Sequence, residues 1–303
     1  MNLSQIELLR LLSENGFNLS KTAEKMHVVQ SAASRQLQLF ENELGAPLVK
    51  RNGKKMTGLT PLGLQVIEQA DLIDHAKQNI LAIASEYKNG ETGILQIATT
   101  HTQAKYFLPK PIQQFRRRYP GVKIYMQQSS PQRLIEYLHN NQADLAICTE
   151  RVDEDAGLVV EHCYEWHHAL VMPKGHPLET EAITLERLAE FPVLTYSFGY
   201  TGRSNIEKAF HALGLDLDIV LAAADTDVIK TYVRLGLGVG LIAEMAYDRE
   251  FDRDLVIKSL GHLIPCSVTK IAYLKEHYLP AYARHFIEAL RIEAHAQTVS
   301  IPS

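Results

Sequence analysis

Hydrophobic positions in the first sixty residues recur at helical spacing and predict a set of short helices. The apolar face of the first helix comprises Ile6, Leu8, Leu9, Leu11 and Leu12. We expect a second helix to begin at Ser20 as its N-cap, and a third over residues 31–44 to end at Gly45 as its C-cap. Residues 27–30 separate these two helices. A short turn between two helices is typical of a helix-turn-helix.

The next pattern predicts a β-hairpin followed by one long helix. Residues 48–60 contain Asn52-Gly53, the strongest short hairpin signal, between two candidate strands. Thr60 and Pro61 are suited to the N-cap and first position of a helix that extends to Tyr87. Its heptad seam consists of Val66, Ala70, Ile73, Lys77, Ile80, Ala84 and Tyr87. This regularity favours a self-association helix, and packing of the helix on its own domain is the alternative.

Beyond residue 90 the chain alternates strand and helix patterns. We expect strands at residues 94–98, 123–127, 145–149, 169–172, 193–196, 219–222, 240–243 and 269–274. Such alternation predicts α/β organisation with parallel sheets. About 210 residues of this kind indicate two subdomains, with crossings near Cys163 and Cys266.

Composition and charge narrow the class of protein. The 303 residues are 46% hydrophobic and 22% charged, which excludes disorder of the whole chain. The net charge is −4, yet residues 1–58 carry +3, as expected for a nucleic-acid-binding module on an acidic body. Three scattered cysteines, the absence of a signal-peptide pattern and the absence of a long apolar run favour the cytoplasm.

The helix-turn-helix offers candidate DNA contacts at two places. The outward side of its second helix would present Gln30, Ser31, Ser34, Arg35 and Gln38, with Ala33, Leu37 and Phe40 packed inward. Glutamine and arginine can bond base edges in the major groove, and serine suits phosphate. The hairpin would add the phosphate-binding charges of Lys50, Arg51, Lys54 and Lys55. A helical protein-interaction domain with a basic edge is the alternative.

Residues 20–63 resemble the winged helix-turn-helix of LysR-type transcriptional regulators. The resemblance rests on Thr22-Ala23, Gln30, Ala33-Ser34-Arg35-Gln36, Glu41, Leu44-Gly45, Leu48, Arg51, Thr60 and Gly63. The chain departs from that family at Ser31, where proline is usual, and at Val49, where phenylalanine is usual. The resemblance implies a winged helix-turn-helix over residues 1–59, a dimerising linker helix over 60–88 and a two-lobed, periplasmic-binding-protein-like effector domain over 89–303. Its first lobe would be 89–162 plus 267–303, and its second lobe 163–266.

The effector half shows two hydroxyl-rich segments at predicted helix starts. Residues 99–103 are Thr-Thr-His-Thr-Gln, and residues 198–204 are Phe-Gly-Tyr-Thr-Gly-Arg-Ser. Free backbone N–H groups and hydroxyls at a helix N-terminus suit a small anion, although ordinary helix capping explains each segment alone. Thr149 ends a predicted strand, where sites in α/β proteins gather. Arg203 would either assist the ligand or pair with a surface acid.

These segments, together with residues 226–240, resemble the CysB branch of the LysR-type family. The resemblance implies a homotetrameric regulator of sulfur assimilation and cysteine biosynthesis that binds promoter DNA and contacts RNA polymerase. It also implies an effector rather than a cofactor: N-acetylserine or O-acetylserine, with sulfate able to occupy the same pocket and thiosulfate or sulfide opposing induction. The implied ligand residues are Thr100, Thr102, Gln103, Thr149 and Thr201. The Cbl-like regulators of alkanesulfonate use share much of this pattern.

Other features of the chain point away from different functions. The glycines at 236, 238 and 240 follow a predicted helix and precede a strand, the reverse of a dinucleotide-binding order. His162, Cys163, His167 and His168 lack a second ligand pair with metal-site spacing. No nucleophile–base constellation indicates an enzyme. A sulfate-type solute-binding protein is the rival class, and the helix-turn-helix counts against it.

Overall fold

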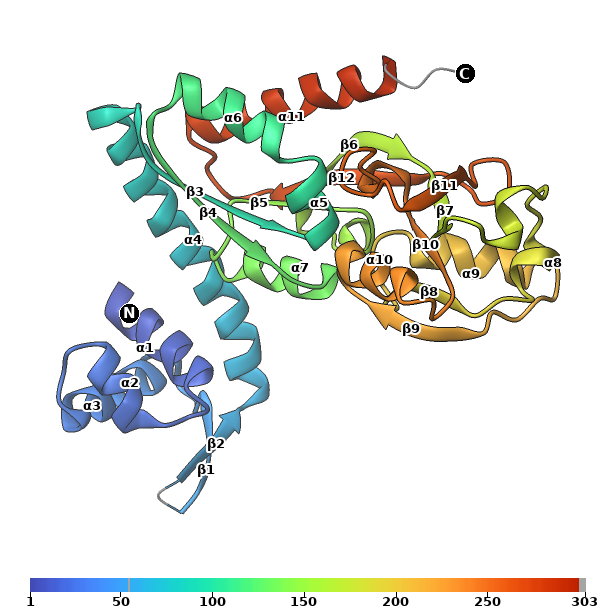
Figure 1. The fold of residues 1–303 in the computed structure, drawn as a ribbon. Helices are drawn as coiled ribbons and strands as arrows, with labels where there is room; N and C mark the ends of the chain where they lie inside the picture. The colour runs from blue at the N-terminus through green and yellow to red at the C-terminus, as the bar shows by residue number, and fades with distance from the viewer. Residues whose placement is uncertain (54, 300–303) are drawn as a thin grey trace. The chain divides into compact units, whose positions relative to one another are not determined.

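The computed structural model describes residues 1–53 and 55–299, with the backbone alone at 85, 89 and 297–299. It divides the chain into a helical unit, residues 1–84, and an α/β unit, residues 85–303 (Figure 1). The helical unit holds α1 (Leu3–Glu14), α2 (Leu19–Lys25), α3 (Gln30–Leu44), β1 (Val49–Asn52), β2 (Lys55–Leu59) and most of α4 (Pro61–Asn89). This is the predicted helix-turn-helix with its hairpin wing and long helix.

Caps account for where these helices begin and end. The side chain of Asn18 accepts a hydrogen bond from the backbone N–H of Lys21, so the N-cap of α2 lies two residues before the predicted cap at Ser20. That prediction was wrong because asparagine caps a helix as well as serine does. α3 ends as predicted at Gly45, whose φ of 73° is left-handed. The N-cap of α4 is Thr60, whose Oγ1 accepts from the N–H of Gly63 at 3.0 Å.

The core of the helical unit includes the first half of α4. Ala70 is buried in that core, and Val66 and Ile73 pack against it. Lys77, the polar interruption of the seam, lies 3.5 Å from Glu7 of α1. The N-terminal half of the predicted seam therefore packs on its own unit, which was the alternative interpretation. Ile80, further along the seam, is 66% exposed.

The α/β unit contains two five-stranded sheets. The first lobe is built on the sheet β4-β3-β5-β12-β6, and the second lobe on the sheet β11-β7-β10-β8-β9. The first lobe comprises β3 (Thr92–Thr99), α5 (His101–Tyr106), α6 (Pro109–Arg118), β4 (Gly121–Gln128), α7 (Pro131–His139), β5 (Leu145–Cys148), η1 (Val152–Glu154), β6 (Leu158–Trp166), β12 (Ser267–Leu274) and α11 (Ala281–Val299). The second comprises β7 (His168–Pro173), η2 (Pro177–Glu179), α8 (Leu185–Leu188), β8 (Val193–Tyr196), α9 (Arg203–His211), β9 (Ile219–Ala223), α10 (Thr226–Arg234), β10 (Val239–Ala243), η3 (Glu244–Ala246) and β11 (Leu255–Ser259).

Both sheets are mixed, which corrects the prediction of parallel sheets. The pairs β3–β4, β3–β5, β8–β9 and β8–β10 are parallel, whereas β12 and β7 run antiparallel to their neighbours. The antiparallel strands are those next to the crossings between the lobes. β6 pairs with β12 through Trp166 and β7 begins at His168, so the chain first changes sheet at His167. The strands β6 and β11 had not been predicted.

Candidate functional site

The polar residues predicted on α3 share its exposed side. Gln30, Ser31, Ser34, Arg35 and Gln38 are exposed, and Ala33, Leu37 and Phe40 are at most 2% exposed, as predicted. The N-cap residue Val29 makes no side-chain cap bond, so the first backbone N–H groups of α3 have no side-chain cap. Uncapped N–H groups at a helix start suit a phosphate group. The exposed face therefore combines polar and basic side chains with a helix start that has no side-chain cap.

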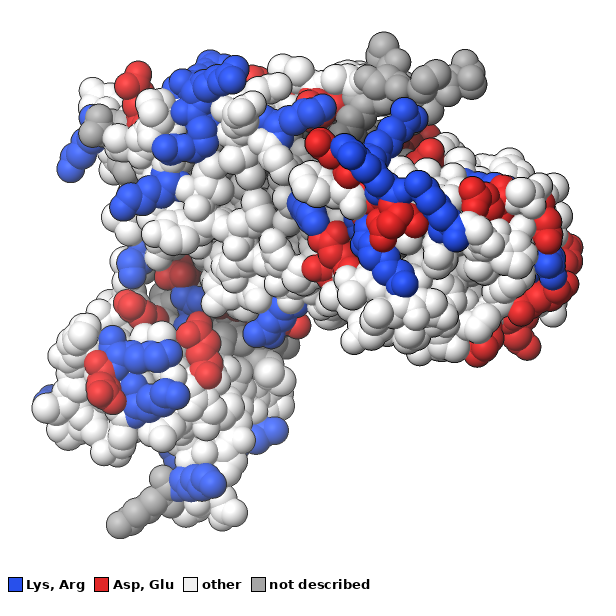
Figure 2. Space-filling view, viewed as in Figure 1, with Lys and Arg blue, Asp and Glu red and all other residues white. Residues whose placement is uncertain are grey.

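The wing is fastened to α3 by a buried carboxylate. Glu41 is 7% exposed, and its Oε1 accepts from the backbone N–H of Leu48 at 2.8 Å. Its Oε2 accepts from Nη2 of Arg51 at 2.7 Å. Arg51 thus holds the hairpin in place, and its charge is already paired. Lys50 and Lys55 are exposed, and Lys54 lies outside the described residues. Figure 2 shows basic side chains on this hairpin and over the helices of the unit.

In the α/β unit, the sequence-predicted ligand residues are mostly buried. Thr100, Thr102, Gln103 and Thr201 are 0–2% exposed, and Thr149 at the end of β5 is 8% exposed. Thr100 is the N-cap of α5 but makes no side-chain cap bond. The hydroxyl oxygens of Thr102 and Thr201 lie 3.5 Å apart, although one belongs to the first lobe and the other to the second. The structure thus brings two of the five residues together across the lobes.

Gln103 belongs to a hydrogen-bond network that joins α5 to β6 and β12 of the first lobe. Its Nε2 donates to Oγ1 of Thr269 at 3.0 Å, and its Oε1 accepts from the hydroxyl of Tyr164 at 2.5 Å. The indole Nε1 of Trp166 donates to the same Thr269 oxygen at 3.1 Å. Sequence analysis did not assign these partners to the site. No local pattern in the sequence marked Tyr164, Trp166 or Thr269.

Thr201 and Gly202 form a strained turn between the lobes. Thr201 has φ of 43°, a left-handed conformation that a β-branched residue rarely adopts. Gly202 has φ of 70°, and a Cβ there would lie 2.3 Å from Oγ of Ser267, so only glycine fits. Backbone strain of this kind clusters at ligand sites. The neighbouring Arg203 bonds the carbonyl of Tyr196 at 2.7 Å and Glu207 at 2.8 Å, so its charge is used inside the second lobe.

An open cavity of about 450 Å³ lies beside this turn. Thr149 lines it, and the other four predicted ligand residues do not. Its lining includes six charged residues: Glu150, Arg151, Asp153, Glu154, Lys208 and Lys270. The Oγ of Ser204 donates to Glu150 at 3.1 Å and so joins the lobes at the cavity. The volume is within the range of small-molecule sites.

His168 sits between this site and the core. Burial lowers the pKa of His168 to about 4, and the neighbouring backbone of Thr201 offsets part of that shift. Its ring packs on Trp166 with centroids 4.9 Å apart. The imidazole is therefore neutral at physiological pH. Within residues 1–53 and 55–299, no group of three or more histidine, cysteine or acidic side chains could hold a metal ion.

Two further sequence predictions can be located. α10 ends at Arg234, and Gly236 and Gly238 form the turn into β10, in the order that excludes a dinucleotide loop. None of the helices described is long and apolar enough to cross a membrane.

A winged helix-turn-helix joined to a two-lobed α/β unit with an interlobe cavity defines a ligand-responsive class of DNA-binding protein. Residues 3–64 match the bacterial regulatory helix-turn-helix proteins of the lysR family, and residues 88–294 match the LysR substrate binding domain. The chain therefore belongs to the LysR family of transcriptional regulators, which are not enzymes.

Its relatives place the chain more narrowly within that family. It is 42% identical to the transcriptional regulator SsuR of Burkholderia cenocepacia over 95% of this chain and 94% of that protein. It is 40% identical to CysB of the same organism over 96% of this chain and 93% of that protein. The crystal structure of the cofactor-binding domain of the Cbl regulator is 39% identical with a TM-score of 0.65, covering 70% of this chain and 95% of that one. The chain thus groups with the SsuR, CysB and Cbl regulators.

Proposed function

We propose that this protein is a cytoplasmic regulator of sulfur-assimilation and cysteine-biosynthesis genes that responds to a small anionic effector. The effector would be a sulfate-like anion or an acetylserine, held by Thr100, Thr102, Gln103, Thr149 and Thr201. The observation that carries this proposal is the approach of Thr102 and Thr201 from opposite lobes. A ligand that bonds both hydroxyls contacts both lobes and can therefore change how they are arranged.

The chemistry of these residues suits a reversible sensor. All five side chains are neutral donors, and Arg203 is occupied by Tyr196 and Glu207. Charge-assisted bonds are roughly twice as strong as neutral ones, so an anion held by these neutral donors is released more readily. The hydroxyl oxygens of Thr102 and Thr201 lie 3.5 Å apart, so both can donate to one small anion that enters while the lobes are apart. Binding then shifts the populations of lobe arrangements by the difference in affinity between them.

On DNA, we propose that Gln30, Ser31, Ser34, Arg35 and Gln38 contact the major groove while Lys50, Lys54 and Lys55 bind phosphates. The exposure of the described members of this set supports their role. Arg51 supports the wing through Glu41. Homodimers and homotetramers would form through the exposed apolar side chains of α4, among them Leu72, Ile80 and Ile83, and RNA polymerase would be the partner in activation.

The test is calorimetric titration of the full chain with sulfate, thiosulfate, N-acetylserine and O-acetylserine. Thr100→Val keeps the side-chain shape and removes one donor from the anion. An unmet bond to a charged group costs about 1.5–3 kcal/mol, so affinity should fall roughly tenfold to a hundredfold. Thr180→Val, at an exposed position of the second lobe, is the matched control. Equal affinity in wild type and Thr100→Val would remove the site from these residues.

A second candidate is regulation of alkanesulfonate-use genes in the manner of the Cbl-like regulators. The near-equal identities to SsuR, CysB and the Cbl domain support keeping it. When ethanesulfonate and adenylyl sulfate are added to the same titration, the ligand that binds most tightly separates the two functions.

A further inference from the structure

The short helix α5 carries polar contacts at both of its ends. Thr102 and Gln103 lie in its first turn, and Lys105 and Tyr106 end the helix. Whereas the first pair contributes to the proposed effector site, the second pair reaches α10 of the second lobe. At about 1.5 Å per residue the whole helix is only about 9 Å long, so its two ends move together.

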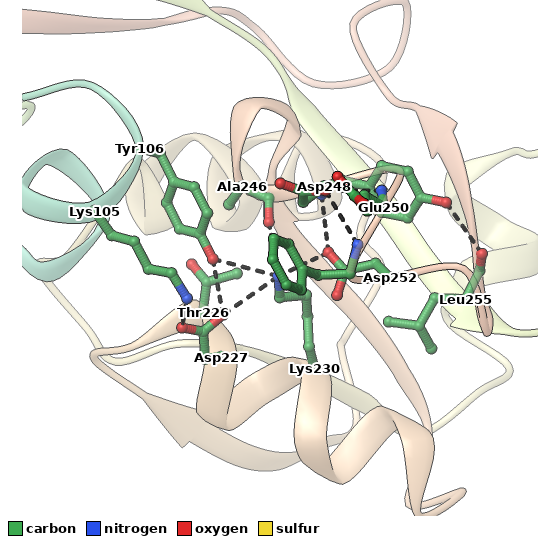
Figure 3. Close-up of polar contacts among 12 residues, drawn as sticks. Lys105, Tyr106, Thr226, Asp227, Lys230, Ala246, Asp248, Glu250, Asp252 and Leu255 are labelled. Atoms are coloured by element: carbon green, nitrogen blue, oxygen red, sulfur yellow. Dashed lines mark hydrogen bonds and ion pairs between the residues drawn. The ribbon is translucent and has the colours of Figure 1, made fainter. Parts of the chain in front are cut away.

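Tyr106 makes the central contact of the second pair. Its hydroxyl donates to Oδ1 of Asp227 at 2.8 Å and accepts from Nζ of Lys230 at 3.3 Å. Figure 3 shows the phenol pointing from α5 toward these two side chains on α10. Lys105 adds an ion pair with the other carboxylate oxygen of Asp227. All of these contacts join residues more than 120 positions apart in the chain.

The second lobe holds its part of this network without help from the first. Lys230 is 4% exposed, and its Nζ donates to Oδ2 of Asp252 at 2.8 Å and to the carbonyl of Ala246 at 2.9 Å. Arg234 binds the other oxygen of Asp252 at 2.6 Å. The buried lysine is thus neutralised inside its own lobe. The Tyr106 hydroxyl therefore contacts charged side chains that the second lobe already holds in place.

The protonation state of the phenol suits this contact. Burial and the neighbouring Asp227 carboxylate raise the pKa of Tyr106, so the hydroxyl keeps its proton and donates it. The ion pair of Lys105 lies in solvent, where such pairs contribute little. The hydroxyl of Tyr106 is therefore the contact whose loss should matter most.

We propose that Tyr106 is a positioning residue of the effector site, which fastens the C-terminal end of α5 to Asp227 and Lys230 of the second lobe. This inference rests on the proposed function. The fastened arrangement is the one in which Thr102 approaches Thr201, so it brings the ligand donors of both lobes within reach of one small anion. Tyr106 thereby links lobe arrangement to effector affinity without touching the effector.

The test compares Tyr106→Phe with wild type as full chains, using inorganic sulfate as the probe. The variant keeps the ring and leaves the bonds of Lys230 to Asp252 and Ala246 in place. Losing the bonds of the hydroxyl to two charged side chains should weaken sulfate binding roughly tenfold to a hundredfold. Trp166 is the only tryptophan of the chain and bonds Thr269 beside Gln103, so its fluorescence reports the sulfate-induced change. That change should shift to higher sulfate concentration by the same factor.

Tyr273→Phe is the matched control, because the Tyr273 hydroxyl bonds Glu161 at 2.9 Å within the first lobe alone. It should leave sulfate affinity unchanged even where it lowers thermal stability. Equal or tighter sulfate binding by Tyr106→Phe would overturn the proposal. So would equal losses of sulfate affinity in the two variants, because the effect would then be a general consequence of removing a hydroxyl.

A ligand-free measurement separates this inference from the proposed function. Hydrogen exchange of the unliganded chain should become faster in both α5 and α10 of Tyr106→Phe, because the contact restrains both helices. If the wild-type protein binds no sulfate, the proposed anion site fails. The exchange measurement still decides whether Tyr106 fastens α5 to α10. Unchanged exchange in α10 would refute the contact between the lobes.

Discussion

The helical unit carries its candidate site on its surface, whereas the α/β unit buries most of its own. The base-reading side chains of α3 are exposed on a scaffold that Leu37 and Phe40 anchor from below. The threonines of the other site are almost wholly covered and touch across two lobes. A duplex can dock on a preformed face, but a small ligand reaches buried donors only if the lobes move. The proposed function therefore combines a preformed DNA-binding face with a ligand site that depends on movement of the lobes.

The largest expected effect is a loss of stability of the α/β unit in mild acid. His168 has a pKa of about 4 in the folded protein and about 6.5 when unfolded. Between these values the unfolded chain binds a proton that the native chain does not, so stability falls as pH falls from 6.5 to 4. The loss should approach about 3 kcal/mol at pH 4. Urea unfolding followed by Trp166 fluorescence measures it.

The variant His168→Phe tests whether His168 causes this dependence of stability on pH. Burial also lowers the pKa of His176, which adds to the slope in the same direction. His168→Phe keeps a ring against Trp166 but has no proton to bind, so most of the slope should disappear. If the dependence of stability on pH is unchanged in this variant, groups other than His168 cause it.

The sequence predicted the helical unit more completely than the site of the α/β unit, for a physical reason. The helix boundaries, the wing and the Gly45 cap follow from residues within a few positions of one another, and the predicted boundaries miss by one or two residues: the cap of α2 is Asn18, α3 begins at Gln30 and α4 ends at Asn89. The α/β site depends on distant pairs: Gln103 meets Tyr164 and Thr269, which are 61 and 166 residues away. No local pattern encodes such a meeting. The strand β6 was missed because its residues, Leu-Val-Val-Glu-His-Cys-Tyr-Glu-Trp, do not alternate strictly between apolar and polar.

The next effect concerns the support beneath the exposed site. Glu41→Ala removes the acceptor for the N–H of Leu48 and the partner of Arg51. Leaving the buried N–H unpaired should destabilise the helical unit by about 1–3 kcal/mol. Chemical unfolding followed by far-ultraviolet circular dichroism measures this loss. Glu43→Ala, at an exposed position of the same helix, should change stability by less than about 0.5 kcal/mol. Equal losses of stability in the two variants would contradict the supporting role of the Glu41 carboxylate.

A comparable free energy should appear on DNA when a base-reading side chain is removed. Gln30→Ala should cost about 1–3 kcal/mol of discrimination at one base pair if the amide bonds adenine at two points. Because Gln30 is exposed, the fold should be unaffected. Selection of binding sites from a random library measures the preference. An unchanged preference would mean that the exposed face of α3 does not read sequence through this residue.

The smallest expected effect comes from one phosphate contact of the wing. Lys50 is exposed on β1, so Lys50→Ala removes a charge without disturbing the core. Affinity should fall by a similar factor on every DNA sequence, and the slope of log affinity against log salt should flatten by about one unit. Lys21→Ala, at an exposed position on α2, tests whether any lysine of the helical unit has this effect. A sequence-dependent loss in Lys50→Ala, or an equal flattening in Lys21→Ala, would contradict a specific phosphate contact on the wing. Sulfate binding should be unchanged in both variants, since the effector donors lie in the other unit.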